Sequence, residues 1–76
     1  MMNDPTAVDS LLEGQPDLLT TEDICTLMRV SQGTVLRWMK EQGLPVISVG
    51  PRLRRVQREH FRQWLLKADE IDDTKD

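Results

Sequence analysis

The chain has 76 residues, 38% of them hydrophobic, and a formal net charge of −3 at pH 7. A chain of this length makes one domain, and its small core leaves little room for a deep substrate pocket. The single cysteine excludes an internal disulfide, and the absence of a long apolar run leads us to expect neither a signal peptide nor a membrane span.

Charge is distributed unevenly along the chain. Residues 1–18 contain four acidic side chains and no Lys or Arg, and residues 68–76 carry a net charge of −4. The intervening residues 19–67 contain nine Lys or Arg and four acidic residues, a net charge of +5. A partner at contact range responds to the local field, so this basic body is compatible with nucleic acid despite the negative total.

The two ends are predicted to be disordered acidic arms. Residues 1–17 contain two prolines and Gly14, and their apolar period is weak, so Val8 and its neighbours are expected to make no more than a transient helical turn. Residues 69–76 are too acidic and too poor in apolar side chains to pack. The folded domain is therefore predicted to span residues 18–68.

The first helix is predicted to begin at Thr20 or Thr21. Thr20 can cap the free amides of the first turn, and Asp23 stands three residues later, as in a capping box. Apolar residues at helical spacing form a stripe that faces the core: Ile24, Leu27 and Met28. Cys25 lies beside this stripe, and we interpret it as a small buried residue, because no basic partner would activate its thiol.

A second helix is predicted from Gln32 to Glu41, after a turn at Arg29 and Val30. Ser31 is its expected N-cap, and Gly43 its expected stop. The inward stripe consists of Val35, Trp38 and Met39. The outward face consists of Gln32, Gly33, Leu36, Arg37 and Lys40.

A basic hairpin is predicted next, with strands at 44–49 and 53–56 joined by a turn at Gly50 and Pro51. Four arginines lie on it or directly after it: Arg52, Arg54, Arg55 and Arg58. Two strands alone are marginally stable, so we expect the hairpin to lean on the helices.

The last predicted helix runs from about Arg58 to Ala68. Its apolar stripe consists of Phe61, Trp64, Leu65 and Ala68. Both tryptophans of the chain, Trp38 and Trp64, fall on such stripes, which favours packing in the core over stacking on bases. His60 is interpreted as a solvent-facing polar residue.

Segments distributed over residues 18–67 resemble the small excisionase-type DNA-binding domains of the MerR superfamily. The matching residues are Leu19–Asp23, Leu27–Ser31, Thr34–Lys40, Leu44–Pro45, Val49–Gly50, Arg55–Val56, Arg58–Glu59 and Trp64–Leu65. The resemblance implies a mainly α fold, a winged helix-turn-helix with three helices and a two-stranded wing.

The resemblance also implies how the domain meets DNA. The second helix would enter the major groove, where Arg37 can bridge O6 and N7 of guanine, and the wing arginines would reach an adjacent minor groove. Thr21 would offer a backbone amide to a phosphate. The DNA-binding residues expected in this way are Thr21, Ser31, Gln32, Gly33, Leu36, Arg37, Lys40, Arg52, Arg54 and Arg55.

The chain departs from the family pattern at several positions. Arg29 replaces a glycine common in the turn, so a left-handed backbone there would be strained. Gly33 and Leu36 are poor base readers, which lowers the sequence specificity expected of the second helix. Gln57 replaces a proline common before the last helix.

Three functions remain open. The first is an excisionase of a phage or mobile element, which binds repeated sites cooperatively, bends the duplex and assists an integrase. The second is a small transcriptional regulator with the same domain, and the third is a protein-interaction module that uses its acidic arms. We expect no enzymatic activity, because the chain shows no catalytic, cofactor-binding or metal-binding constellation, and no small-molecule ligand. The expected location is the cytoplasm of a bacterial or phage-infected cell, with possible self-association on DNA.

Overall fold

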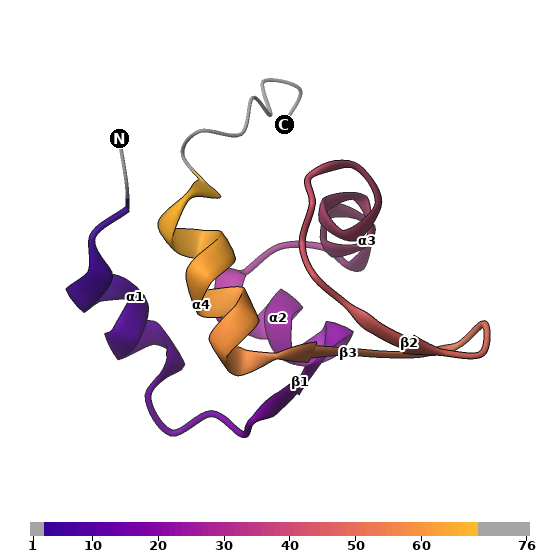
Figure 1. Ribbon diagram of the computed structural model, residues 1–76, viewed down its shortest axis with the longest axis horizontal. Coiled ribbons are helices and arrows are strands. Elements are labelled where there is room, and N and C mark those ends of the chain that lie inside the picture. The colour runs from indigo at the N-terminus through magenta and orange to yellow at the C-terminus, as the bar shows by residue number, and fades with distance from the viewer. Residues whose placement is uncertain (1–2, 69–76) are drawn as a thin grey trace.

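Four helices and three strands make up residues 3–68, the part of the chain that the computed structural model describes. In chain order they are α1 (Pro5–Leu12), β1 (Leu18–Thr20), α2 (Thr21–Met28), α3 (Gln32–Glu41), β2 (Ile47–Val49), β3 (Leu53–Gln57) and α4 (Arg58–Leu66). The strands form one antiparallel sheet in the order β1–β3–β2, and the β2–β3 hairpin projects from the body (Figure 1). The arrangement is compatible with a small winged helix-turn-helix, with one helix and one strand more than predicted.

The predicted capping box at the start of α2 is confirmed. The Asp23 N–H donates to Oγ1 of Thr20 over 3.0 Å, and the Thr20 N–H donates to Oδ2 of Asp23 over 3.0 Å. Backbone amides that a helix start leaves without a partner are thereby satisfied by side chains only three residues away. The start of α2 is therefore set by local sequence.

Helix α3 has the predicted bounds. The Thr34 N–H donates to the hydroxyl of Ser31 over 3.3 Å, so Ser31 is the N-cap. Gly43 follows the helix with a φ of 75°, a left-handed conformation that glycine adopts at little cost. The chain turns there, and Leu44 is buried directly after it.

The turn between α2 and α3 contains a strained residue. Arg29 has a φ of 57° and a ψ of 47°, and it is the one non-glycine residue with a positive φ among residues 3–68. The carbonyl of Cys25 accepts hydrogen bonds from the N–H groups of Arg29 and Val30, which closes the end of α2. A Cβ atom crowds the following carbonyl in this conformation, at a cost of about 1–2 kcal/mol.

The sheet contains a strand that the sequence analysis did not predict. β1 pairs with β3, with Leu19 opposite Val56, and both of these side chains are fully buried. The hairpin is therefore held by a third strand as well as by the helices. β2 is shorter than predicted, because the chain before Ile47 is not part of the ladder.

Nine buried apolar side chains form the core, and every helix contributes to it. They are Val8, Leu12, Leu19, Ile24, Val35, Leu44, Val56, Phe61 and Leu65. Trp38 and Trp64 pack against this core with ring centroids 5.4 Å apart, as the stripe spacing predicted. The indole N–H of Trp64 donates to the carbonyl of Gln42 over 2.9 Å, which joins α4 to the end of α3.

The prediction that residues 1–17 form a disordered arm is wrong for the segment that forms α1. The Thr6 N–H donates to the carboxylate of Asp4 over 3.0 Å, so Asp4 caps the helix, and Pro5 suits its first position. Val8 and Leu12, one turn apart, are buried beside α4. A helix of this length is marginal alone, so packing on α4 stabilises it. The predicted tail at residues 69–76 lies outside the described residues.

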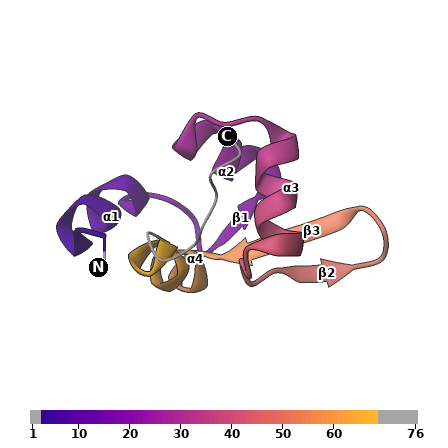
Figure 2. The ribbon, with the colours of Figure 1, turned by 90° about the horizontal axis from the view of Figure 1, so that it is seen from above.

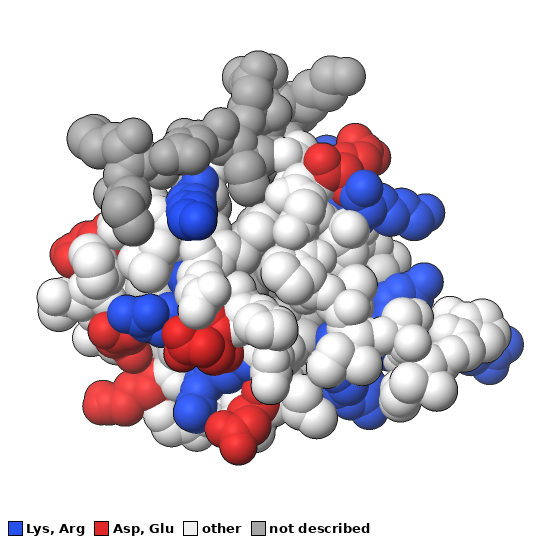
Figure 3. All heavy atoms as spheres, viewed as in Figure 1, with Lys and Arg blue, Asp and Glu red and all other residues white. Residues whose placement is uncertain are grey.

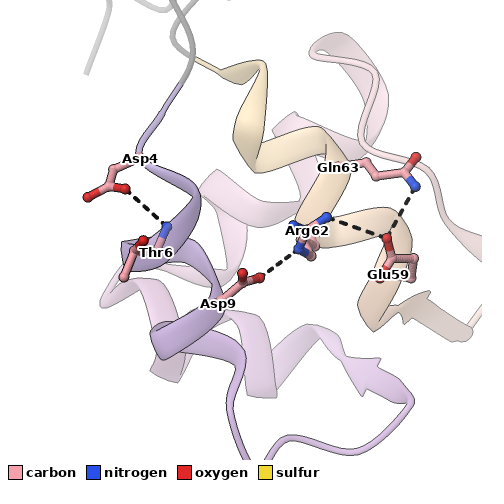
Figure 4. A network of polar contacts seen from close by, with 6 residues as sticks. All are labelled: Asp4, Thr6, Asp9, Glu59, Arg62 and Gln63. Atoms are coloured by element: carbon pink, nitrogen blue, oxygen red, sulfur yellow. Dashed lines mark hydrogen bonds and ion pairs between the residues drawn. The ribbon is translucent and has the colours of Figure 1, made fainter.

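An ionic contact also joins α1 to α4 (Figure 4). The Nε–H of Arg62 donates to the carboxylate of Asp9 over 2.6 Å. The Nη1 atom of Arg62 lies 3.6 Å from the carboxylate of Glu59. The hydrogen bond to Asp9 raises the pKa of the Arg62 guanidinium. α1 lies beside α4, on the side of the molecule away from the hairpin (Figure 2).

Candidate nucleic-acid interface

Helix α3 presents polar and basic residues along its outward face. Gln32, Gly33 and Lys40 are exposed, whereas Leu36 and Arg37 are half-buried. This face is opposite the buried Val35, so its orientation follows from the helical period of the apolar stripe. The five residues expected on this face therefore lie on one helix, which stands beside the β2–β3 hairpin (Figure 2).

The polar residues at the start of each helix in the pair differ in exposure and in hydrogen bonding. The hydroxyl of Ser31 accepts the Thr34 N–H and lies 3.1 Å from the hydroxyl of Thr34, so its role as a cap engages it already. Thr21 is half-buried in the first turn of α2. Both residues lie at the positive end of a helix dipole, where a backbone amide can meet a phosphate.

The hairpin arginines lie on different sides of the sheet. Val56 points into the core, and side chains alternate along a strand, so Arg54 lies on the helix-covered face and Arg55 on the opposite face. Arg52 is exposed in the connecting turn. A guanidinium N–H of Arg55 donates to the carbonyl of Arg54 over 2.8 Å, so Arg55 is partly engaged by its own strand. Arg52 is thus the most accessible of the three.

Arg58, counted in the sequence among four neighbouring arginines, contacts the segment that precedes β1. Its guanidinium lies 3.2 Å from the carboxylate of Asp17 and donates to the carbonyl of Gln15. The backbone N–H of Arg58 donates to the carbonyl of Asp17 over 2.8 Å. Arg58, which the sequence pattern assigned to the basic cluster, is therefore paired with an acidic residue of the N-terminal segment.

Charge is distributed unevenly over the surface (Figure 3). Acidic groups gather over α1 and the start of α4, where basic groups lie among them, whereas basic groups predominate on the side formed by α3 and the hairpin. No Asp or Glu occurs from residue 42 to residue 58, a range that covers both hairpin strands and their turn. The hairpin therefore has a positive local field although the whole chain is negative.

Exposed apolar side chains on the sheet were not assigned a role from the sequence. Among the described residues, the large apolar side chains that are exposed are Leu18, Val46, Ile47, Val49 and Leu53. In the strand register, Val49 stands opposite Leu53, and Ile47 stands opposite Arg55. Ile47, Val49 and Leu53 therefore share the sheet face away from the helices. The sequence showed that Ile47 and Val49 share one face of a strand, but it did not show that this face is exposed.

Other kinds of site were also sought in residues 3–68. No three His, Cys, Asp or Glu side chains in this part of the chain gather where they would hold a metal ion. None of its helices combines the length and apolar character needed to cross a bilayer. Cys25 is a half-buried free thiol that packs against the core.

Comparison with known proteins identifies the domain. The family model described as a helix-turn-helix domain, a family of small DNA-binding domains, matches residues 18–69. No curated protein and no solved structure matches the chain. The match begins at β1, so α1 lies outside the matched domain. Since the match covers the helix pair, the hairpin and α4, the chain belongs to the helix-turn-helix domain family.

Proposed function

We propose that this protein binds duplex DNA with α3 in the major groove and the β2–β3 hairpin in the adjacent minor groove. The observation that carries the proposal is the position of the exposed face of α3 beside an arginine-bearing hairpin that has no acidic residue. A helix of this kind fits the major groove, and phosphate contacts from the arginines would fix its register. The protein acts by binding, not by catalysis.

Each group of residues has its own role in this proposal. Arg37 reads a guanine edge, while Gln32 and Lys40 contact bases or phosphates beside it. Arg52 and Arg54 contact phosphates and so hold the hairpin against the DNA backbone. Ser31, Gly33 and Thr21 stand near the helix starts, where the chain can approach phosphates closely.

We propose further that the DNA carries repeated sites and that the protein is an excisionase of a phage or mobile element. A single module of this size makes a small interface, so neighbouring copies would reinforce one another's binding. Its partner would then be an integrase acting in the same bacterial cytoplasm. This role rests on the resemblance of residues 18–67 to excisionase-type domains, and a small transcriptional regulator is the second candidate.

Selection from a random-sequence duplex library at near-physiological salt tests these roles. Enrichment of short direct repeats, filled in steps with altered gel mobility, supports the excisionase proposal. A single palindromic site filled in one step favours a dimeric regulator. If no duplex is retained at any salt concentration, the DNA-binding proposal is wrong, and a protein partner for the acidic segments becomes the better hypothesis.

Arginine variants separate base readout from phosphate contact. Arg37→Ala should weaken binding to the enriched site about 5- to 150-fold and relax preference at one base pair, as expected for loss of a bidentate contact. Arg52→Ala and Arg54→Ala should weaken binding to all sequences alike and reduce the salt slope by about one each. Lys67→Ala, which removes an exposed charge just after α4, is the matched control and should change neither. Equal loss on every sequence for Arg37→Ala would contradict its readout role.

A further inference from the structure

The end of the β2–β3 hairpin bears an exposed apolar pair. Val49 is 63% exposed and Leu53 is 42% exposed, and the two residues are opposite each other in the last pair before the turn. Side chains opposite each other on one face of an antiparallel pair are in contact range, so Val49 and Leu53 form one small apolar surface. Neither side chain is buried by the described residues.

This part of the hairpin stands free of the body. β1 pairs with β3 only from Arg55 to Gln57, so the ladder between Val49 and Leu53 is two-stranded. Both ribbon views show the hairpin extending beyond the helices (Figures 1 and 2). A narrow ribbon that protrudes in this way can enter a groove that the body cannot.

The surroundings of the pair indicate its partner. Arg52 lies in the turn, and Arg55 lies on the same sheet face two residues after Leu53, whereas the nearest acidic residues in the sequence are Glu41 and Glu59. An apolar surface with a cation on either side complements a polyanion with apolar walls. The DNA minor groove has this character, with phosphates at its rims and deoxyribose along its sides.

We propose that Val49 and Leu53 form an apolar wedge that packs into the minor groove and opens a base step, so that the duplex bends around the hairpin. The proposal deepens the proposed function and rests on it. Aliphatic side chains make no hydrogen bonds to base edges, so their contribution comes from displacing groove water and separating stacked bases. Apolar wedges of this type kink duplexes by about 20–90°.

A second copy of the chain is a poorer occupant of this surface. Stable protein interfaces bury at least about 1,000 Å², far more than two aliphatic side chains on a ribbon supply. The positive charges around the pair would also face one another across a symmetric contact. DNA instead adds phosphate contacts to the same surface.

The test measures bend angle and affinity separately, using the full chain and a duplex labelled at both ends for energy transfer. The double variant Val49→Ser/Leu53→Ser should reduce the bend by at least half, with a loss of affinity below about tenfold, because phosphate contacts supply much of the binding. Leu18→Ser is the matched control, since Leu18 is 47% exposed on the same sheet face at the opposite end. It should change neither quantity. Circular dichroism establishes that each variant is folded.

Each outcome distinguishes the wedge from the underlying DNA-binding proposal. If the unaltered protein does not bind DNA, both proposals fail. If it binds without bending, or if the double variant bends the duplex as strongly as the unaltered protein, the wedge alone is wrong. Loss of stepwise filling of repeated sites, with the bend at each site retained, would also overturn the wedge and assign Val49 and Leu53 to a contact between copies.

Discussion

Replacement of Arg29 by glycine should stabilise the protein. Arg29 adopts left-handed helical angles in the turn between α2 and α3, and its side chain is exposed. Relief of the Cβ crowding gains about 1–2 kcal/mol, and the greater freedom of glycine in the unfolded chain offsets about 0.5–1 kcal/mol of that gain. We therefore expect the free energy of unfolding to rise by about 0.5–1 kcal/mol.

Thermal unfolding followed by circular dichroism measures this change. For a domain of this size, 1 kcal/mol shifts the midpoint by about 4–8 °C, so Arg29→Gly should raise the melting temperature by roughly 2–8 °C. Arg29→Ala is the matched control, because alanine removes the guanidinium but keeps the Cβ atom that causes the strain. Its melting temperature should stay close to that of the unaltered protein.

The reasoning is refuted if the glycine variant is no more stable than the alanine variant. In that case the Cβ atom at position 29 does not destabilise the folded protein. A DNA-binding measurement tests separately whether the Arg29 guanidinium contacts a phosphate. Both variants lose the same guanidinium, so any phosphate contact that Arg29 makes should be lost to the same extent in each.

Three further changes test the packing and the charge distribution. Thr20→Val removes the side-chain cap of α2 at nearly constant volume and should lower the free energy of unfolding by about 1 kcal/mol in urea titrations; an unchanged midpoint would show that the capping box is unimportant. Leu12→Ala should lower it by about 2–3 kcal/mol, because Leu12 is 4% exposed and its loss leaves a cavity between α1 and α4; a loss under 0.5 kcal/mol, on the same scale, would mean that α1 packs only weakly. Asp17→Asn releases Arg58 from its ion pair and should tighten binding to random-sequence DNA at low salt more than Glu13→Gln does, although both remove one negative charge; equal effects would attribute the change to net charge alone.

The helix pair could be predicted from sequence because its determinants are local. The capping side chains of Thr20 and Ser31 bond to amides three residues away, and the apolar stripe of each helix repeats within one or two turns. The bounds of α3, the position of the hairpin turn and the packing of both tryptophans against the core follow from such short-range patterns. The ten expected DNA-contacting residues came from a family resemblance, and their roles remain predictions.

The features that sequence analysis missed depend on residues far apart in the chain. Leu18–Thr20 becomes a strand only because β3 lies beside it, and three residues carry too little periodicity to reveal a strand on their own. The apolar residues of α1 are too few to stabilise an isolated helix, and α4 supplies the surface that they need.

Tertiary structure also decided which charges and apolar groups are available to a partner. Arg58 has the same sequence neighbourhood as Arg54 and Arg55, yet Asp17 engages it, since pairing of β1 with β3 brings the two residues together. In the sequence, Val49 and Leu53 look like ordinary strand residues. In the fold they are exposed on the sheet face away from the helices, at the end of the hairpin that β1 does not reach. The sequence by itself thus determined the helix pair and the turn of the hairpin through local hydrogen bonds and periodicity. Long-range pairing decided which charged and apolar groups stay exposed, because local patterns carry no information on distant partners.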